Sequence, residues 1–101
     1  MQFGHFPHHR HALRGKRILV VEDEALVAML VEDELADAGA EVIGPASSVD
    51  QALDLVERMA ATGRGLHAAV LDINLQGTMV SPVADRLAEL GVPIVFATGY
   101  S

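Results

Sequence analysis

The sequence predicts an open α/β sheet of parallel strands with helices on both faces. Short β-rich runs alternate with helical patterns from residue 17 onwards, and their spacing is that of βαβ units with right-handed crossovers. The first run, ILVV at residues 18–21, is apolar throughout, as in a strand buried on both faces. With 101 residues, half of them apolar, the chain is long enough for one domain with its own core.

The first unit consists of the strand at residues 18–21 and a helix of about residues 24–38. Gly39 stands where a helix commonly ends in a left-handed residue. Residues 41–44, EVIG, then predict the second strand.

A second helix is predicted to begin after Ser48. Ser48 and Gln51 have the spacing of a capping box, and Thr62 followed by Gly63 marks the helix end. One stripe of this helix is apolar and predicts its core-facing side: Ala52, Leu55, Val56 and Met59.

The third strand is AAVLD, residues 68–72, and a loop that holds Gly77 follows it. Ser81 as N-cap and Pro82 at the first helical position predict the start of a third helix. The residues predicted to face inward, before a stop at Gly91, are Val83, Leu87 and Leu90.

The fourth strand, IVFAT at residues 94–98, completes the pattern. Ligands of open α/β sheets gather at the carboxyl ends of the strands. Glu22 and Asp23 end the first strand, Asp72 ends the third and Thr98 ends the fourth. We therefore expect three carboxylates and a hydroxyl to converge on one edge of the sheet.

Three carboxylates in one place repel one another unless a cation lies among them. Oxygen ligands, with no cysteine in the chain, suit a hard ion such as Mg²⁺. One carboxylate of the set could attack phosphorus as a nucleophile, and Thr98 could donate a hydrogen bond to the transferred phosphoryl group.

Composition excludes several other classes. A formal net charge of −7 disfavours direct nucleic-acid binding. The apolar run at residues 25–31 is too short to cross a membrane, and the N-terminus lacks the apolar segment of a secretory signal, so we expect a cytoplasmic protein. Residues 1–16 predict a flexible tail, and His67 has no evident partner; the tail holds His5, His8, His9 and His11.

The motifs VVEDE, VLDINL and PIVFATGY together resemble those of a known family. Residues 17–101 resemble the receiver domain of bacterial two-component response regulators, which has a flavodoxin-like fold. The FATGY segment is similar to that of single-domain receivers in alphaproteobacterial stress signalling. The resemblance implies a regulatory phosphoacceptor rather than an enzyme, signalling through protein contacts after phosphorylation by a histidine kinase or a histidine phosphotransfer protein.

The resemblance also implies a role for each site residue. Asp72 would accept the phosphoryl group, Asp23 would bind Mg²⁺ directly, and Glu22 would hold the ion directly or through water. Asn74 would offer its backbone carbonyl to the metal. Thr98 would be the switch hydroxyl that moves toward the phosphoryl oxygens.

The sequence departs from the family at its C-terminal end. The residues from Arg17 onwards hold only about three and a half βα units, so the fourth helix, fifth strand and fifth helix of the family are missing, together with the lysine that follows that strand. Gln76 stands where the family usually has proline, and Tyr100 follows Thr98 closely. A degenerate receiver that binds its partner without phosphorylation is therefore an alternative.

Further alternatives concern the acids themselves. An aspartyl-phosphate phosphohydrolase would need a second acid two residues after its nucleophile, but that position holds Asn74. Glu22 and Asp23 alone could be the acidic start of a helix, and Asp72 alone a turn residue. Glu24 is expected in the first turn of a helix, where its negative charge stabilises the helix through the dipole, so its expected role is structural.

Self-association is expected from two apolar surfaces. The run ALVAMLV at residues 25–31 is apolar around its whole circumference, and the strand at residues 94–98 would lie unpaired at the sheet edge. We therefore expect a homo-oligomer that buries one or both surfaces.

Overall fold

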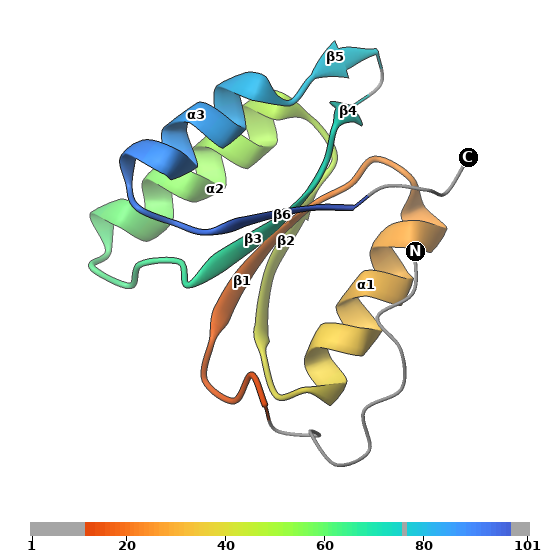
Figure 1. The fold of residues 1–101 in the computed structure, drawn as a ribbon, viewed down its shortest axis with the longest axis vertical. Helices are drawn as coiled ribbons and strands as arrows, with labels where there is room; N and C mark the ends of the chain where they lie inside the picture. Colours follow the sequence, from red (N-terminus) through yellow and green to blue (C-terminus); the bar gives the residue numbers. More distant parts are fainter. Residues whose placement is uncertain (1–11, 76, 98–101) are drawn as a thin grey trace.

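The computed structural model describes residues 12–75 and 77–97, and it confirms the predicted fold class. Four parallel strands form one sheet in the order β2-β1-β3-β6, and a short hairpin of β4 and β5 stands apart from it (Figure 1). The elements in chain order are β1 Arg17–Val21, α1 Ala25–Asp37, β2 Glu41–Ala46, α2 Val49–Ala61, β3 Ala68–Asp72, β4 Asn74–Leu75, β5 Thr78–Met79, α3 Ser81–Glu89 and β6 Ile94–Ala97.

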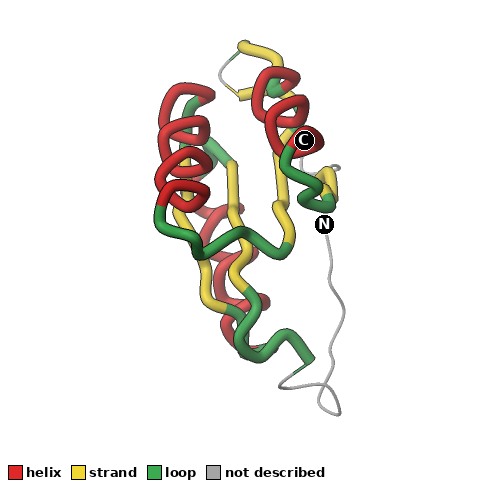
Figure 2. Tube along the Cα trace, turned by 90° about the vertical axis from the view of Figure 1, so that its left-hand side faces the viewer, coloured by secondary structure: helices red, strands yellow, loops and turns green. Residues whose placement is uncertain are grey.

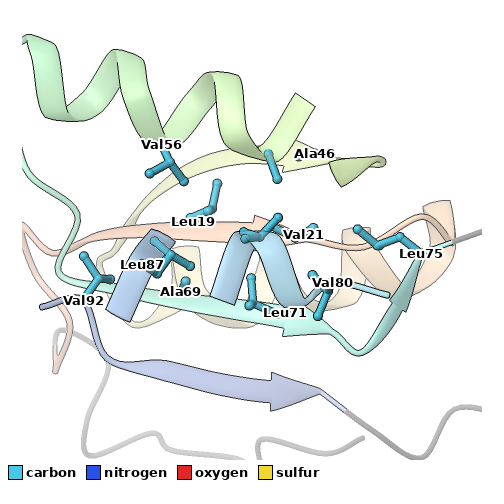
Figure 3. Packing of buried hydrophobic residues seen from close by; sticks show 12 residues of the cluster. Leu19, Val21, Ala46, Val56, Ala69, Leu71, Leu75, Val80, Leu87 and Val92 are labelled. Carbon is cyan, nitrogen blue, oxygen red and sulfur yellow. The ribbon is translucent and has the colours of Figure 1, made fainter. Parts of the chain in front are cut away.

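The helices cover both faces of the sheet, α1 on one side and α2 with α3 on the other (Figures 1 and 2). Strand β1 is buried on both faces, because Val20 joins the cluster under α1 while Leu19 and Val21 join the cluster under α2 and α3. Val56 of α2 and Leu87 of α3 pack in this second cluster (Figure 3).

The helix ends follow from local sequence. Gly39 has a φ of 95°, and the N–H groups of Gly39 and Ala40 donate to the carbonyls of Ala36 and Leu35, which is a Schellman motif. At the start of α2 the Ser48 hydroxyl oxygen accepts from the Gln51 N–H at 3.1 Å. A capping box would also have the Gln51 side chain accept from the Ser48 backbone N–H. In the structure the Gln51 side chain accepts from the backbone N–H and the hydroxyl of Ser47 instead.

Two predictions around α3 are wrong. Its N-cap is Val80, so Ser81 is already helical, and the Val80 carbonyl accepts from Val83 and Ala84. Leu90 was expected to face inward but is exposed, because it is the C-cap residue and lines a shallow apolar groove with Leu66. The loop around Gly77 also contains structure that was not predicted, the β4-β5 hairpin.

The segment before β1 is more ordered than expected. Residues 12–15 form a turn, and the Leu13 N–H donates to the Ala38 carbonyl at 2.8 Å. Leu13 packs against the cluster under α1. The four histidines of the predicted tail lie outside the described residues.

His67 has a partner that the sequence did not reveal. The ring Nδ1 of His67 accepts a hydrogen bond from the backbone N–H of Arg17 at 2.9 Å. The backbone N–H of His67 donates to the Arg17 carbonyl at 2.8 Å. Desolvation, with the charges of Arg17 and Lys16, lowers the pKa of His67. The neutral ring is therefore the form that joins β3 to β1.

The apolar run of α1 is buried on one side and exposed on the other. Val27, Ala28, Val31 and Leu35 are buried against the sheet, whereas its outer residues Leu26, Met29 and Leu30 are exposed. Within the described part of the chain, no helix is long and apolar enough to cross a membrane.

Candidate functional site

The candidate site lies at the carboxyl edge of the two central strands. Glu22 and Asp23 directly follow β1, and Asp72 is the last residue of β3. Val21 and Leu71 are register partners in these adjacent strands, so the three acids emerge side by side. One carboxylate oxygen from each residue lies within 4.8 Å of those from the other two.

Glu22 is held firmly in this cluster. Its side chain is buried, with a relative exposure of 8%. Its N–H donates to the Ala46 carbonyl at 2.9 Å, and its Oε2 accepts from the Glu24 N–H at 3.0 Å. These two bonds tie the loop after β1 to the end of β2 and fix the direction of the carboxylate.

The cluster concentrates negative charge. Burial raises the pKa of Glu22, while the hydrogen bond from the Glu24 N–H opposes this change. The charge of Asp72, and the hydrogen bond and charge of Asp23, raise the pKa further. A cation beside the cluster would therefore stabilise the ionised form of Glu22.

The other predicted site residues are placed only in part. Asn74 lies two residues beyond Asp72 as the first residue of β4, where it pairs with Met79. Thr98 lies outside the described residues, but Ala97 before it is the register partner of Asp72. The chain therefore leaves β6 next to the acid that ends β3.

Glu24 lies one position earlier than its pattern predicted. It occupies the N-cap position of α1 rather than the first turn, and its side chain makes no capping hydrogen bond. Its contribution to the site is its backbone N–H, which donates to Glu22.

Sequence reasoning missed two exposed apolar residues on the elements that carry the site, Ile73 directly after Asp72 and Met79 of β5. Leu26 in the first turn of α1 is exposed too, and it belongs to the apolar run at residues 25–31 that the sequence singled out. The available signal for Ile73 was its position directly after the strand that ends in Asp72.

Comparison with known proteins supports the fold. The structure is similar to the response regulator PhyR from Brucella abortus, with a TM-score of 0.69 and 30% identity over 79% of this chain and 32% of that chain. It is also similar to the anti-anti-sigma factor PhyR from Bartonella quintana, with a TM-score of 0.67 and 24% identity over 79% of this chain and 31% of that chain. No protein-family model and no curated protein matches the sequence.

The chain thus spans about a third of the length of each of these two proteins. Its four-stranded parallel sheet is a receiver-like, flavodoxin-type fold. Of the Phe-Ala-Thr-Gly segment, only Phe96 and Ala97 lie among the described residues.

Proposed function

We propose that this receiver-like chain accepts a phosphoryl group on Asp72 and passes the signal on through protein contacts. The observation that supports this most directly is the convergence of three carboxylates within 4.8 Å at the carboxyl edge of the sheet. In open α/β sheets this edge is where ligands bind. A structural role alone would not call for a buried glutamate between two other acids.

The donor set fits Mg²⁺. All three side chains offer carboxylate oxygens, and mutual repulsion among them falls when a hard divalent ion binds. We propose Glu22, Asp23 and Asp72 as its holders, with the backbone carbonyl of Asn74. When bound, the ion would offset the negative charge that otherwise repels an incoming phosphoryl group.

Asp72 is better placed than Glu22 to act as the nucleophile. Glu22 is buried and its Oε2 is engaged by the Glu24 N–H, whereas Asp72 is half-buried and its next neighbour Ile73 is exposed. A carboxylate oxygen of Asp72 would attack phosphorus of a phosphohistidine. The new O–P bond forms as the N–P bond breaks, and the imidazole leaves and takes up a proton.

The donor is proposed to be a histidine kinase or a histidine phosphotransfer protein in the cytoplasm. A protein donor must approach the edge that holds Asp72. The exposed Leu26, Ile73 and Met79 offer apolar contacts around that approach. In this proposal Thr98 is the hydroxyl that bonds the phosphoryl oxygens and changes the surface near β6.

Two other functions make different predictions in one experiment. The chain is incubated with a small phosphoramidate donor and, separately, with a phosphoester, each with Mg²⁺ or with a chelator. A stable, Mg²⁺-dependent gain of one phosphoryl mass supports the proposal. Turnover of the phosphoester without accumulation would show a phosphohydrolase, and no modification in either would show a phosphorylation-independent binding module.

A thermal measurement tests the metal site by itself. Millimolar Mg²⁺ should raise the melting midpoint of the chain by several degrees, because an ion at ten times its Kd contributes about 1.4 kcal/mol.

Glu22→Gln should raise the melting midpoint measured without metal and remove most of the Mg²⁺ response. The raised pKa means that ionised Glu22 costs stability, and this cost grows as the pH rises through the folded pKa.

Glu24→Gln is the matched control for this test, because Glu24 is exposed and its side chain makes no capping bond. It should leave both midpoints near those of the unmodified chain. An equal Mg²⁺ response in Glu22→Gln and the unmodified chain would remove Glu22 from the metal site.

A further inference from the structure

The N-terminal edge of the sheet, at the opposite end from the acids, is closed by a histidine. His67 directly precedes β3, whose other end is Asp72, and its ring lies against Arg17, the first residue of β1. Strands β1 and β3 lie side by side at the centre of the sheet (Figure 1). The contact therefore joins the two strands that carry the three carboxylates, at the end away from them.

The ring nitrogen of His67 occupies the position of a main-chain acceptor. The N–H and C=O of one strand residue point to the same neighbouring strand. The Arg17 carbonyl accepts from the His67 backbone N–H at 2.8 Å, so the Arg17 N–H also points toward β3. There it donates to the ring Nδ1 at 2.9 Å. A side chain that can take up a proton thus replaces a carbonyl that accepts at every pH.

The loop before His67 is tied to β1 by the same residue and is otherwise loosely packed. The Arg17 Nε donates to the Gly65 carbonyl at 2.8 Å. Residues 62–65 are exposed, and a Cβ on Gly63 or Gly65 would meet nothing within 4 Å. Exposed segments with few packing contacts open at low cost in free energy. This edge can therefore open while the core stays folded.

The charges around the ring oppose a proton on it. Desolvation lowers the pKa of His67, and the charges of Arg17 and Lys16 lower it further. The register partner of Arg17 in β2 is Glu41, whose carboxylate is held by Arg64 at 2.8 Å. The charged side chains of β1, β2, the turn before β1 and the loop before β3 are Arg14, Lys16, Arg17, Glu41 and Arg64.

We propose that His67 is a pH-sensitive latch on the N-terminal edge of the sheet. While the ring is neutral, its Nδ1 accepts from Arg17 and the loop of residues 62–66 is closed onto β1. A proton taken up at Nδ1 places two donors face to face, the Arg17 N–H and the new N–H of the ring. The hydrogen bond is then lost, the ring turns away and the loop opens. The latch does not depend on the function proposed for Asp72.

The sign of the pH effect follows from the lowered pKa. The ordinary value is 6.5 and the folded value is lower, so an open or unfolded chain binds the proton more tightly. Stability from the latch is therefore fully present above pH 6.5 and is lost as the pH falls through the folded pKa. Glu22 has a raised pKa, and its protonation at low pH acts in the opposite direction. The measurement must therefore report on the latch itself.

Hydrogen exchange of the Arg17 amide, followed residue by residue by NMR, is that measurement. Its protection relative to the intrinsic exchange rate should fall roughly fivefold between about pH 7.5 and about pH 5, which corresponds to one net hydrogen bond. The Leu19 amide of the same strand is the internal control and should keep its protection, because Leu19 is in the core. The imidazole of His67 should titrate below pH 6.5, with Nδ1 unprotonated in the neutral form.

Two substitutions of His67 separate its proton from its role as an acceptor. His67→Asn places an amide oxygen near the position of Nδ1, so the Arg17 amide should be protected at both pH values. His67→Leu offers no acceptor, so that amide should exchange at both pH values as it does at low pH in the unmodified chain. Both variants should fold, because His67 is exposed. His11→Asn is the matched control and should keep the pH response of the unmodified chain.

Three results would overturn the proposal. The first is protection of the Arg17 amide that is the same at both pH values in the unmodified chain. The second is an equal fall in His67→Leu and the unmodified chain, because the titrating group would then lie elsewhere. The third is a His67 ring that titrates at pH 6.5 or above.

Discussion

Asp72→Asn is expected to abolish phosphorylation of the chain by a small phosphodonor. The amide is a poor nucleophile toward phosphorus. Glu22 is buried and its carboxylate is bonded to the Glu24 N–H, and in this proposal Asp23 is engaged by the metal, so neither is expected to replace Asp72. Intact mass after incubation with Mg²⁺ should show no added phosphoryl group, against nearly complete modification of the unmodified chain.

The same substitution should make the metal-free fold more stable. One negative charge leaves a cluster whose carboxylate oxygens lie within 4.8 Å of one another, so repulsion on Glu22 falls.

Asp37→Asn is the control for the phosphorylation experiment, because Asp37 is exposed at the far end of α1. A phosphoryl mass on Asp72→Asn equal to that on Asp37→Asn would show that the nucleophile lies elsewhere.

Gly44→Ala is expected to be the most damaging change in the fold outside the core. Gly44 has a φ of 106°, which L side chains rarely adopt. A Cβ there would lie 2.9 Å from both the Ala46 nitrogen and the Val20 carbonyl oxygen, and backbone atoms in a paired strand cannot move aside. We expect a loss of about 3 kcal/mol in the free energy of unfolding.

Gly63→Ala is a control that separates the cost of a left-handed backbone conformation from the cost of steric overlap with neighbouring atoms. Gly63 has a φ of 75° and a Cβ there would meet nothing within 4 Å, so the left-handed conformation alone should cost about 1 kcal/mol. Urea denaturation of both variants measures the difference. Equal losses in the free energy of unfolding would show that the close approach at Gly44 does not affect stability.

Gly44→Ala should also weaken the Mg²⁺ response, because the Ala46 carbonyl that accepts from the Glu22 N–H lies two residues from Gly44.

The sequence predicted those parts of the fold that depend on residues close together in the chain. The strand at residues 18–21 is uniformly apolar and proved to be buried on both faces. Gly39 and Gly63 ended their helices as expected, because only a left-handed residue allows the bonds seen there. The convergence of Glu22, Asp23 and Asp72 followed from parallel strands sharing one carboxyl edge.

The parts that could not be predicted depend on pairing between distant segments. His67 acquires its partner only because β3 lies beside β1, which places it against Arg17. The β4-β5 hairpin contains only two residues on each strand, too few for a periodic pattern. Val80 replaced Ser81 as N-cap because its N–H is already bonded to the Ile73 carbonyl, which sets where α3 begins.

The most direct test of the account is to locate the phosphoryl group on the unmodified chain. After incubation with a phosphoramidate donor and Mg²⁺, one sample is treated with hydroxylamine and its intact mass is measured, and a second is reduced with borohydride, which converts an aspartyl phosphate to homoserine, then digested and mapped by mass spectrometry. The account predicts one hydroxylamine-sensitive phosphoryl mass on the intact chain and homoserine in place of Asp72 in the reduced sample, both absent when a chelator replaces Mg²⁺. A phosphoryl group on a histidine of residues 1–11, on Glu22, or on no residue at all would contradict it.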